Sequence, residues 1–167
     1  LVQREGRWGY IDRQGRIAVA IQYDRAKPFR QGLAAVQRDG RWGFIDPAGD
    51  FVIPPSFEAV AGEGFSSGLA GVMINGLWAA IDTGGRTVIP ARYEHPLEFH
   101  EGLAVLRGDE EYGLLDARGR VVVEPTYTLA RPFSDSLAAV MSGGERVGRR
   151  IRQGKWGFVN AEGEVVI

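Results

Sequence analysis

The sequence predicts an all-β protein, a tandem array of five small three-stranded antiparallel units of about 35 residues each. Three observations support this fold class: a tryptophan-containing phrase recurs, turn signals separate short apolar runs, and 24 of the 167 residues are glycine. The units, called repeats 1 to 5, span about residues 1–32, 33–68, 69–102, 103–136 and 137–167. We expect an open, twisted array, with a closed or propeller-like ring as the alternative.

The recurring phrase is clearest at Gly40–Gly49, which reads Gly-Arg-Trp-Gly-Phe-Ile-Asp-Pro-Ala-Gly. Its first aromatic residue recurs at intervals of 34, 36, 34 and 44 residues, at Trp8, Trp42, Trp78, Tyr112 and Trp156. Such a period predicts that each copy is one supersecondary unit and that neighbouring units shield each other's apolar surfaces.

Repeat 2 illustrates the strands expected in every unit. Apolar runs bounded by turn residues predict strands at Leu33–Arg38, Arg41–Ile45 and Phe51–Ile53. Asp39-Gly40 is typical of a two-residue hairpin turn with positive φ at both positions. A turn of this length fixes the pairing and places Val36 opposite Gly43.

Both faces of this hairpin are apolar. One face carries Ala35, Trp42 and Phe44, and the other carries Ala34, Val36 and Ile45. A sheet with one face in water would alternate more cleanly, so we expect each sheet to lie between two neighbours. We also expect the small residue after each tryptophan to leave room for a ring from the adjoining unit.

A second turn pairs an Asp or Asn with a Gly three residues later. The pairs are Asp12/Gly15, Asp46/Gly49, Asp82/Gly85, Asp116/Gly119 and Asn160/Gly163. The Asp or Asn side chain accepts hydrogen bonds from amides ahead of it, and the Gly adopts positive φ. Tandem carboxylates also suggest a metal site, but each Asp is accounted for by its own turn. We therefore expect no metal and no cofactor.

A connector follows each third strand and carries two aromatic residues in phase. These are Tyr23/Phe29, Phe57/Phe65, Tyr93/Phe99 and Tyr127/Phe133. We interpret them as packing residues, because burial of an aromatic side chain contributes about 2–3 kcal/mol. Pro54, Pro90 and Pro125 are expected to end the third strands, since proline lacks an amide donor.

These motifs resemble the bacterial WG repeat family. The residues that carry the resemblance in repeat 2 are Trp-Gly-Phe-Ile-Asp at 42–46, then Gly49, Val-Ile-Pro at 52–54, and the Phe-x-x-Gly-Leu-Ala of 65–70. The resemblance covers nearly the whole chain and implies an all-β tandem repeat from a bacterium, but little about activity. The pattern is altered at Ala79, Tyr112, Asn160 and Ser136.

Two other motifs suggest chemistry. Gly64–Gly68 fits the G-x-S-x-G pattern of serine hydrolases with Ser66 as nucleophile, but the other repeats use these positions as connector. His95 and His100 lie near three Glu but match no common zinc spacing. We interpret all three residues as connector residues and expect no enzyme.

Repeat 5 breaks the period with about ten extra residues between Met141 and Trp156. We expect the insertion to extend the hairpin as a basic finger that contacts phosphate or carboxylate, with a solvated loop as the alternative. The candidate partner-binding residues are Arg146, Arg149, Arg150, Arg152 and Lys155.

The formal net charge of −1 disfavours nucleic acid as a partner, and no apolar run is long enough to span a membrane. We expect a single repeat domain, part of a longer protein, that serves as a non-catalytic binding or scaffolding module. Its partner is expected to be a protein or a cell-envelope polymer. A structural spacer or an accessory domain is the alternative, followed by a hydrolase. Compartment and oligomeric state are left open.

Overall fold

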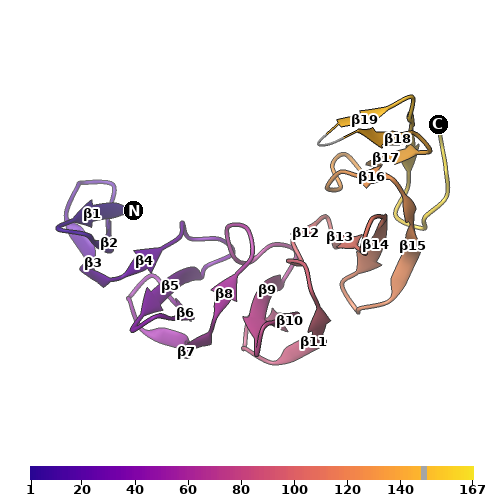
Figure 1. The fold of residues 1–167 in the computed structure, drawn as a ribbon. Coiled ribbons are helices and arrows are strands. Elements are labelled where there is room, and N and C mark those ends of the chain that lie inside the picture. Colours follow the sequence, from indigo (N-terminus) through magenta and orange to yellow (C-terminus); the bar gives the residue numbers. More distant parts are fainter. Residues whose placement is uncertain (148–149) are drawn as a thin grey trace. The chain divides into compact units, whose positions relative to one another are not determined.

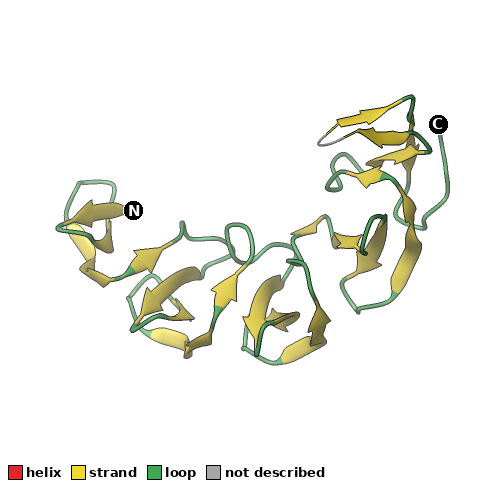
Figure 2. Ribbon diagram, viewed as in Figure 1, coloured by secondary structure: helices red, strands yellow, loops and turns green. Residues whose placement is uncertain are grey.

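The computed structural model describes residues 1–147 and 150–167, and these form strands, turns and loops without a helix (Figure 2). The predicted all-β array is confirmed. Accordingly, the described residues include no helix long and apolar enough to cross a membrane. The chain divides into two compact units, unit 1 at Leu1–Pro96 and unit 2 at Leu97–Ile167.

Unit 1 contains three antiparallel sheets that follow one another along the chain (Figure 1). The first has the order β1-β2-β3, formed by β1 Val2–Arg4, β2 Arg7–Ile11 and β3 Ile17–Tyr23. The second has the order β4-β5-β6-β7, formed by β4 Arg25–Ala26, β5 Ala34–Arg38, β6 Arg41–Ile45 and β7 Phe51–Phe57. The third has the order β11-β10-β9-β8, formed by β8 Ala59–Val60, β9 Leu69–Ile74, β10 Leu77–Asp82 and β11 Thr87–Tyr93.

Unit 2 repeats this plan with one addition. Its first sheet contains β12 Phe99–His100, β13 Leu103–Arg107, β14 Tyr112–Asp116 and β15 Val121–Tyr127. Its second contains β16 Leu129–Ala130, β17 Ala138–Ser142 and β20 Lys155–Val159. A separate two-stranded sheet, β18 Glu145–Val147 and β19 Arg150–Arg152, lies in sequence between β17 and β20.

The connectors contribute a short strand that the sequence did not predict. In unit 1, β4 follows the third strand of repeat 1 but pairs with β5 of repeat 2, with Arg25 opposite Gln37. In the same way β8 pairs with β9 of repeat 3, with Ala59 opposite Met73. The connector strand therefore links consecutive repeats through backbone hydrogen bonds.

The hairpin of repeat 2 has the predicted register. Val36 lies opposite Gly43 and Ala35 opposite Phe44. The turn residues Asp39 and Gly40 have φ of 52° and 78°, as a primed turn requires. The local sequence therefore fixes which side chains share a face.

The two faces of repeat 2 pack into two different cores, as predicted. Ala34, Val36 and Ile45 pack with residues of repeat 1 that include Tyr10, Val19 and Tyr23. Ala35, Trp42 and Phe44 pack with residues of repeat 3 that include Val72 and Ile81. Each repeat thus buries surface that it cannot bury alone.

The aromatic residues of the connectors are packing residues, as predicted. Within unit 1 the rings of Phe44 and Phe65 have centroids 4.8 Å apart, and those of Tyr10 and Phe29 have the same separation. The indoles of Trp42 and Trp78 are buried, whereas Trp156 in unit 2 is 45% exposed.

The third strands differ from the prediction at their prolines. Pro54 lies inside β7 and Pro90 inside β11, so neither residue ends its strand; Pro125 likewise lies inside β15. The pairing of β6 with β7 steps from Trp42↔Phe57 to Phe44↔Ile53, which leaves extra residues on β7. A proline is tolerated there because the bulge on this edge strand needs no donor from it.

The same bulge explains the glycine after tryptophan, for which the predicted neighbour was wrong. A Cβ added at Gly43 would lie 2.6 Å from the carbonyl oxygen of Ile53 and 2.7 Å from the nitrogen of Pro55. The space is therefore filled by the backbone of the same sheet, not by a ring from the next repeat. In repeat 3 the register shift recurs with Ala79, which is fully buried.

Turn residues also contact the preceding repeat. A Cβ added at Gly49 would lie 3.1 Å from Val19 Cγ1, and one at Gly85 would lie 3.2 Å from Ile53 Cγ2. Gly49 and Gly85 have φ of 92° and 82°. These glycines therefore combine positive φ with close packing against the neighbouring third strand.

Candidate functional site

A groove lies on the surface of unit 1 where repeats 1 and 2 meet. It has a volume of about 590 Å³. That volume falls in the range typical of ligand sites. Its lining consists of Trp8, Arg25, Ala26, Lys27, Gln37, Trp42, Glu58, Ala59 and Val60. We call this feature the groove and its location boundary 1/2.

The connector strand β4 and its neighbour β5 position the groove's polar side chains. Because Arg25 pairs with Gln37 across the ladder, both side chains extend from adjacent strands. The amide nitrogen of Lys27 donates to the carbonyl oxygen of Ala35 at 2.8 Å, which fixes the start of the connector after β4. Gln37 Nε2 in turn donates to the carbonyl oxygen of Gly40 at 3.1 Å.

Lys27 bridges the two repeats at the groove. Its Nζ donates to the carbonyl oxygens of Val60, at 2.7 Å, and of Gly62. The same nitrogen lies 5.3 Å from the centroid of the Trp42 ring, within cation–π distance. The lysine therefore holds the connector of repeat 2 against the connector of repeat 1 and covers the indole.

The acidic residue of the lining, Glu58, is already occupied. Its carboxylate accepts from the amide of Asn75 at 3.1 Å and from the amide of Gly76 at 2.9 Å. It also lies 3.5 Å from Arg41 Nη1. These bonds tie Glu58 to the hairpin turn of repeat 3 and to its own repeat.

Arg25 contrasts with Glu58. Its side chain is exposed, and within residues 1–147 and 150–167 the guanidinium has no hydrogen-bond or ion-pair partner. The groove thus presents an unpaired cation beside indole and aliphatic walls. Such a lining suits an anion that carries an apolar body.

The boundary between repeats 2 and 3, boundary 2/3, has the same backbone but different side chains. Ala59 pairs with Met73 as Arg25 pairs with Gln37, and Ala61 N donates to Gly71 O at 2.9 Å as Lys27 N donates to Ala35 O. The same backbone arrangement therefore forms with alanine and methionine at the positions where boundary 1/2 has arginine, lysine and glutamine. A position-by-position comparison of the repeats would therefore have identified the groove residues from the sequence.

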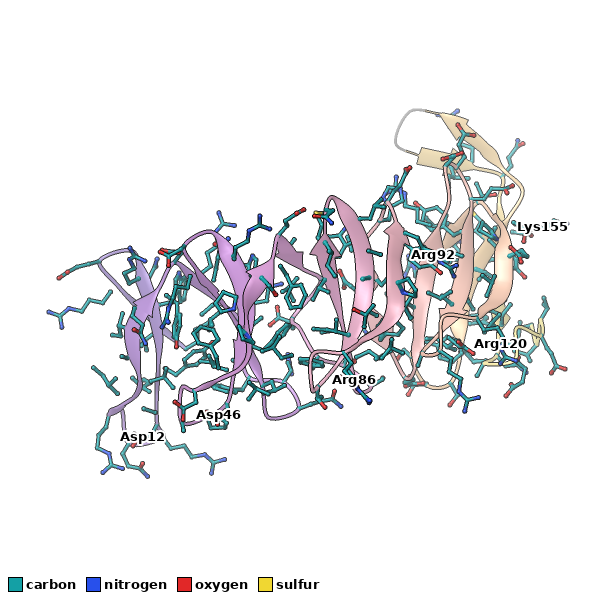
Figure 3. All side chains as sticks on the ribbon, turned by 90° about the horizontal axis from the view of Figure 1, so that it is seen from below. Asp12, Asp46, Arg86, Arg92, Arg120 and Lys155 are labelled. Atoms are coloured by element: carbon teal, nitrogen blue, oxygen red, sulfur yellow. The ribbon has the colours of Figure 1, made fainter. Side chains whose placement is uncertain are left out.

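The recurring aspartates act as turn residues, as predicted. Asp82 Oδ1 accepts from the amides of Gly84 and Arg86 at 3.0 and 2.9 Å, and Asn160 accepts equivalent bonds in repeat 5. The backbone amide of Arg86, followed by its guanidinium, holds the pKa of Asp82 below its ordinary value. Figure 3 shows Asp12, Asp46 and Arg86 along one edge of unit 1.

The described residues contain no group of three or more His, Cys, Asp or Glu side chains placed to hold a metal ion. Ser66 lies in a β-bridge with Leu69, around a tight turn in which Ser67 and Gly68 have φ of 53° and 79°. This is a hairpin-type turn, not the strand-to-helix elbow of the serine hydrolase motif. His95 and His100 lie in the connector region, with His100 exposed.

The basic insertion of repeat 5 forms its own hairpin. Pairing of β17 with β20 stops at Ser142↔Lys155, and β18 then pairs with β19 as a separate sheet. Gly143 and Gly144, with φ of 64° and 92°, turn the chain out of the β17 ladder, so the hairpin is not simply extended.

The predicted partner-binding residues are only partly visible. Arg152 and Lys155 are exposed, and Figure 3 labels Lys155 at the surface of unit 2. Arg149 lies outside the described residues, as do the side chains of Arg146 and Arg150. Partner binding by these five residues stays a prediction.

Comparison with known proteins agrees with the architecture. The WG containing repeat family matches the chain four times, over residues 8–42, 42–78, 79–107 and 112–145. No curated protein and no solved structure matches the chain. Because the matches cover most of the sequence and recur at about the period of the repeating sheets, the chain belongs to the family of WG containing repeats.

Proposed function

We propose that this chain is a non-catalytic repeat module that binds a partner through the groove at boundary 1/2. The observation that carries the proposal is the replacement of Ala59 and Met73 by Arg25 and Gln37 at equivalent backbone positions. Repeat proteins keep the stacking residues constant and vary surface positions for recognition. Arg25 is a charged side chain that packing does not require, and its guanidinium is therefore available for a ligand.

The shape of the site supports the same function. The groove combines the guanidinium of Arg25 and the side-chain amide of Gln37 with the partly exposed indole of Trp8 and the half-buried Ala26. Binding sites typically combine apolar walls with a few placed polar groups. The basic hairpin of repeat 5 is a second candidate surface, because insertions into a repeat often lie on the binding face.

A selection experiment tests this function. The full chain is immobilised and probed with a random peptide library and with an array of polysaccharides, alongside the double variant Arg25→Ala/Gln37→Met, which places the Ala59 and Met73 side chains of boundary 2/3 at the equivalent positions and keeps Lys27. Arg13→Ala serves as control, because Arg13 is also exposed but does not line the groove.

We expect ligands that bind the wild type and Arg13→Ala but not the double variant. If no ligand distinguishes the double variant from the wild type, the groove is not a binding site. A role as a structural spacer or accessory domain would then be the better account. Matching far-ultraviolet circular dichroism of all three proteins establishes that lost binding does not reflect lost folding.

A further inference from the structure

We infer that the groove recognises an acidic peptide segment, in which a Glu or Asp carboxylate pairs with Arg25 and a neighbouring apolar side chain lies against Trp8. The inference rests on the proposed function and names the chemistry of its ligand. It is carried by the unmatched charge of the lining, by the number of donors that the lining offers, and by the composition of the walls.

The lining has an unmatched positive charge. Arg25 is exposed and its guanidinium has no partner among the described residues, while the carboxylate of Glu58 is bonded to the amides of Asn75 and Gly76 and lies 3.5 Å from Arg41. A ligand that brings a carboxylate would therefore pair with Arg25 without displacing an existing ion pair.

The number of donors favours a carboxylate over a phosphate. An arginine binds a carboxylate through two parallel N–H···O bonds, and one guanidinium is sufficient for this geometry. Phosphate sites in proteins typically add further cations or a run of backbone amides at a helix N-terminus or loop. The second cation of the lining, Lys27, already donates from Nζ to the carbonyl oxygens of Val60 and Gly62. The described residues form no helix, and the amide of Lys27 already donates to Ala35 O.

The walls favour a ligand with apolar side chains. Trp8 is partly exposed, and the half-buried Ala26 continues the apolar surface beside it. Trp42 is only 8% exposed and lies under Lys27, so it does not offer the open ring face on which a sugar would stack. A peptide that alternates acidic and aliphatic residues complements the free guanidinium of Arg25 and the partly exposed indole of Trp8.

The test compares two dye-labelled hexapeptides that differ only in charge. One alternates glutamate with leucine, and the other alternates glutamine with leucine. Binding to the full chain is followed by fluorescence anisotropy at low and at physiological salt, with inorganic phosphate as a competitor. The proteins are the wild type, Arg25→Ala, Arg25→Lys and the control Arg13→Ala.

We expect the glutamate peptide to bind at least about tenfold more tightly than the glutamine peptide, because hydrogen bonds to charged groups contribute this much. Arg25→Ala should remove that preference, Arg25→Lys should restore only part of it, and Arg13→Ala should keep it in full. Salt should weaken the glutamate peptide more than the glutamine peptide. Phosphate should compete poorly.

Three results would overturn the inference: equal binding of the two peptides, no binding of either, or an unchanged preference in Arg25→Ala. Effective competition by inorganic phosphate would assign the groove to phosphate instead. If the selection yields neutral peptides or polysaccharides that still require Arg25 and Gln37, the binding function stands and only the acidic-peptide inference fails.

Discussion

Boundaries 1/2 and 2/3 have the same backbone arrangement and differ in the side chains that cover it. At both, a connector strand pairs with the first strand of the next repeat, and a buried tryptophan lies in the second strand. At boundary 1/2 the connector carries Arg25 and Lys27; at boundary 2/3 it carries Ala59 and Ala61. The difference teaches that stacking is set by the strands and the core, and that connector side chains vary independently of it.

Lys27 and Glu58 each make side-chain hydrogen bonds to the following repeat, one at each boundary. Lys27 reaches from repeat 1 to the carbonyl oxygens of Val60 and Gly62 in repeat 2. Glu58 reaches from repeat 2 to the hairpin amides of repeat 3. Both boundaries therefore have side-chain hydrogen bonds to the neighbouring repeat outside the core, but a different residue makes them at each boundary.

The largest predicted effect comes from the shared core. Ile45 lies in the core of boundary 1/2 and Ile81, its equivalent, in that of boundary 2/3, and both are fully buried. Ile45→Ala and Ile81→Ala should each lower the free energy of unfolding by about 2–5 kcal/mol. Urea denaturation of the full chain measures both. A loss at only one of the two positions would break the proposed equivalence of the boundaries.

An intermediate effect is expected where the third strand approaches the second. Gly43→Ala should destabilise the protein by about 1–3 kcal/mol, because the new methyl group would lie 2.6 Å from Ile53 O and the backbone must shift. Repeat 3 already accommodates Ala79, so Ala79→Gly should cost only about 0.5–1 kcal/mol through chain entropy.

Thermal denaturation of Gly43→Ala and Ala79→Gly, side by side, checks this difference. Equal losses would show that repeat 2 has the same room as repeat 3. The close approach of Ile53 would then not be the reason for the glycine.

A smaller, pH-dependent effect is expected at the aspartate turns. Hydrogen bonds, above all from the amide of Arg86, lower the pKa of Asp82 from 3.8. The carboxylate therefore stabilises the fold above its unfolded pKa, and this contribution is lost as the pH falls through the lower folded pKa. Acidification from about pH 6 to about pH 2 should lower the urea midpoint.

Asp82→Asn sharpens this prediction. Asn160 accepts the equivalent turn bonds in repeat 5 at 3.2 and 2.8 Å, so asparagine should preserve the turn. Because an amide does not titrate, the variant should have a flatter acid limb of the urea midpoint than the wild type. An identical acid limb in both proteins would mean that Asp82 contributes nothing to the pH dependence.

Much of this fold follows from the sequence because its signals are local. Asp39-Gly40 sets the hairpin register, Asp82 and its counterparts set the second turn, and the two apolar faces of repeat 2 predict two neighbours. Each of these features depends on residues a few positions apart. Repetition then indicates which of the signals belong to the architecture.

The features that were missed depend on pairing between distant residues. A strand as short as Arg25–Ala26 has no periodicity, and its partner lies in the next repeat. Pro54 is ordinarily read as the end of a strand, and only the bulge opposite Gly43 shows why the strand continues. The groove was missed because the connector residues Arg25 and Lys27 were not compared with Ala59 and Ala61 at the equivalent positions of the next repeat.

We expect stability to depend on the core and recognition to depend on the connector side chains. Two measurements on a single variant test this expectation most directly. Arg25→Ala/Gln37→Met gives boundary 1/2 the alanine and methionine that boundary 2/3 has at Ala59 and Met73, and leaves Lys27 in place. Its free energy of unfolding in urea should stay within about 0.5 kcal/mol of the wild type, because neither side chain is required for packing. Its affinity for the glutamate peptide should fall at least about tenfold. Unchanged peptide affinity, or a loss of stability comparable to that of Ile45→Ala, would contradict the account.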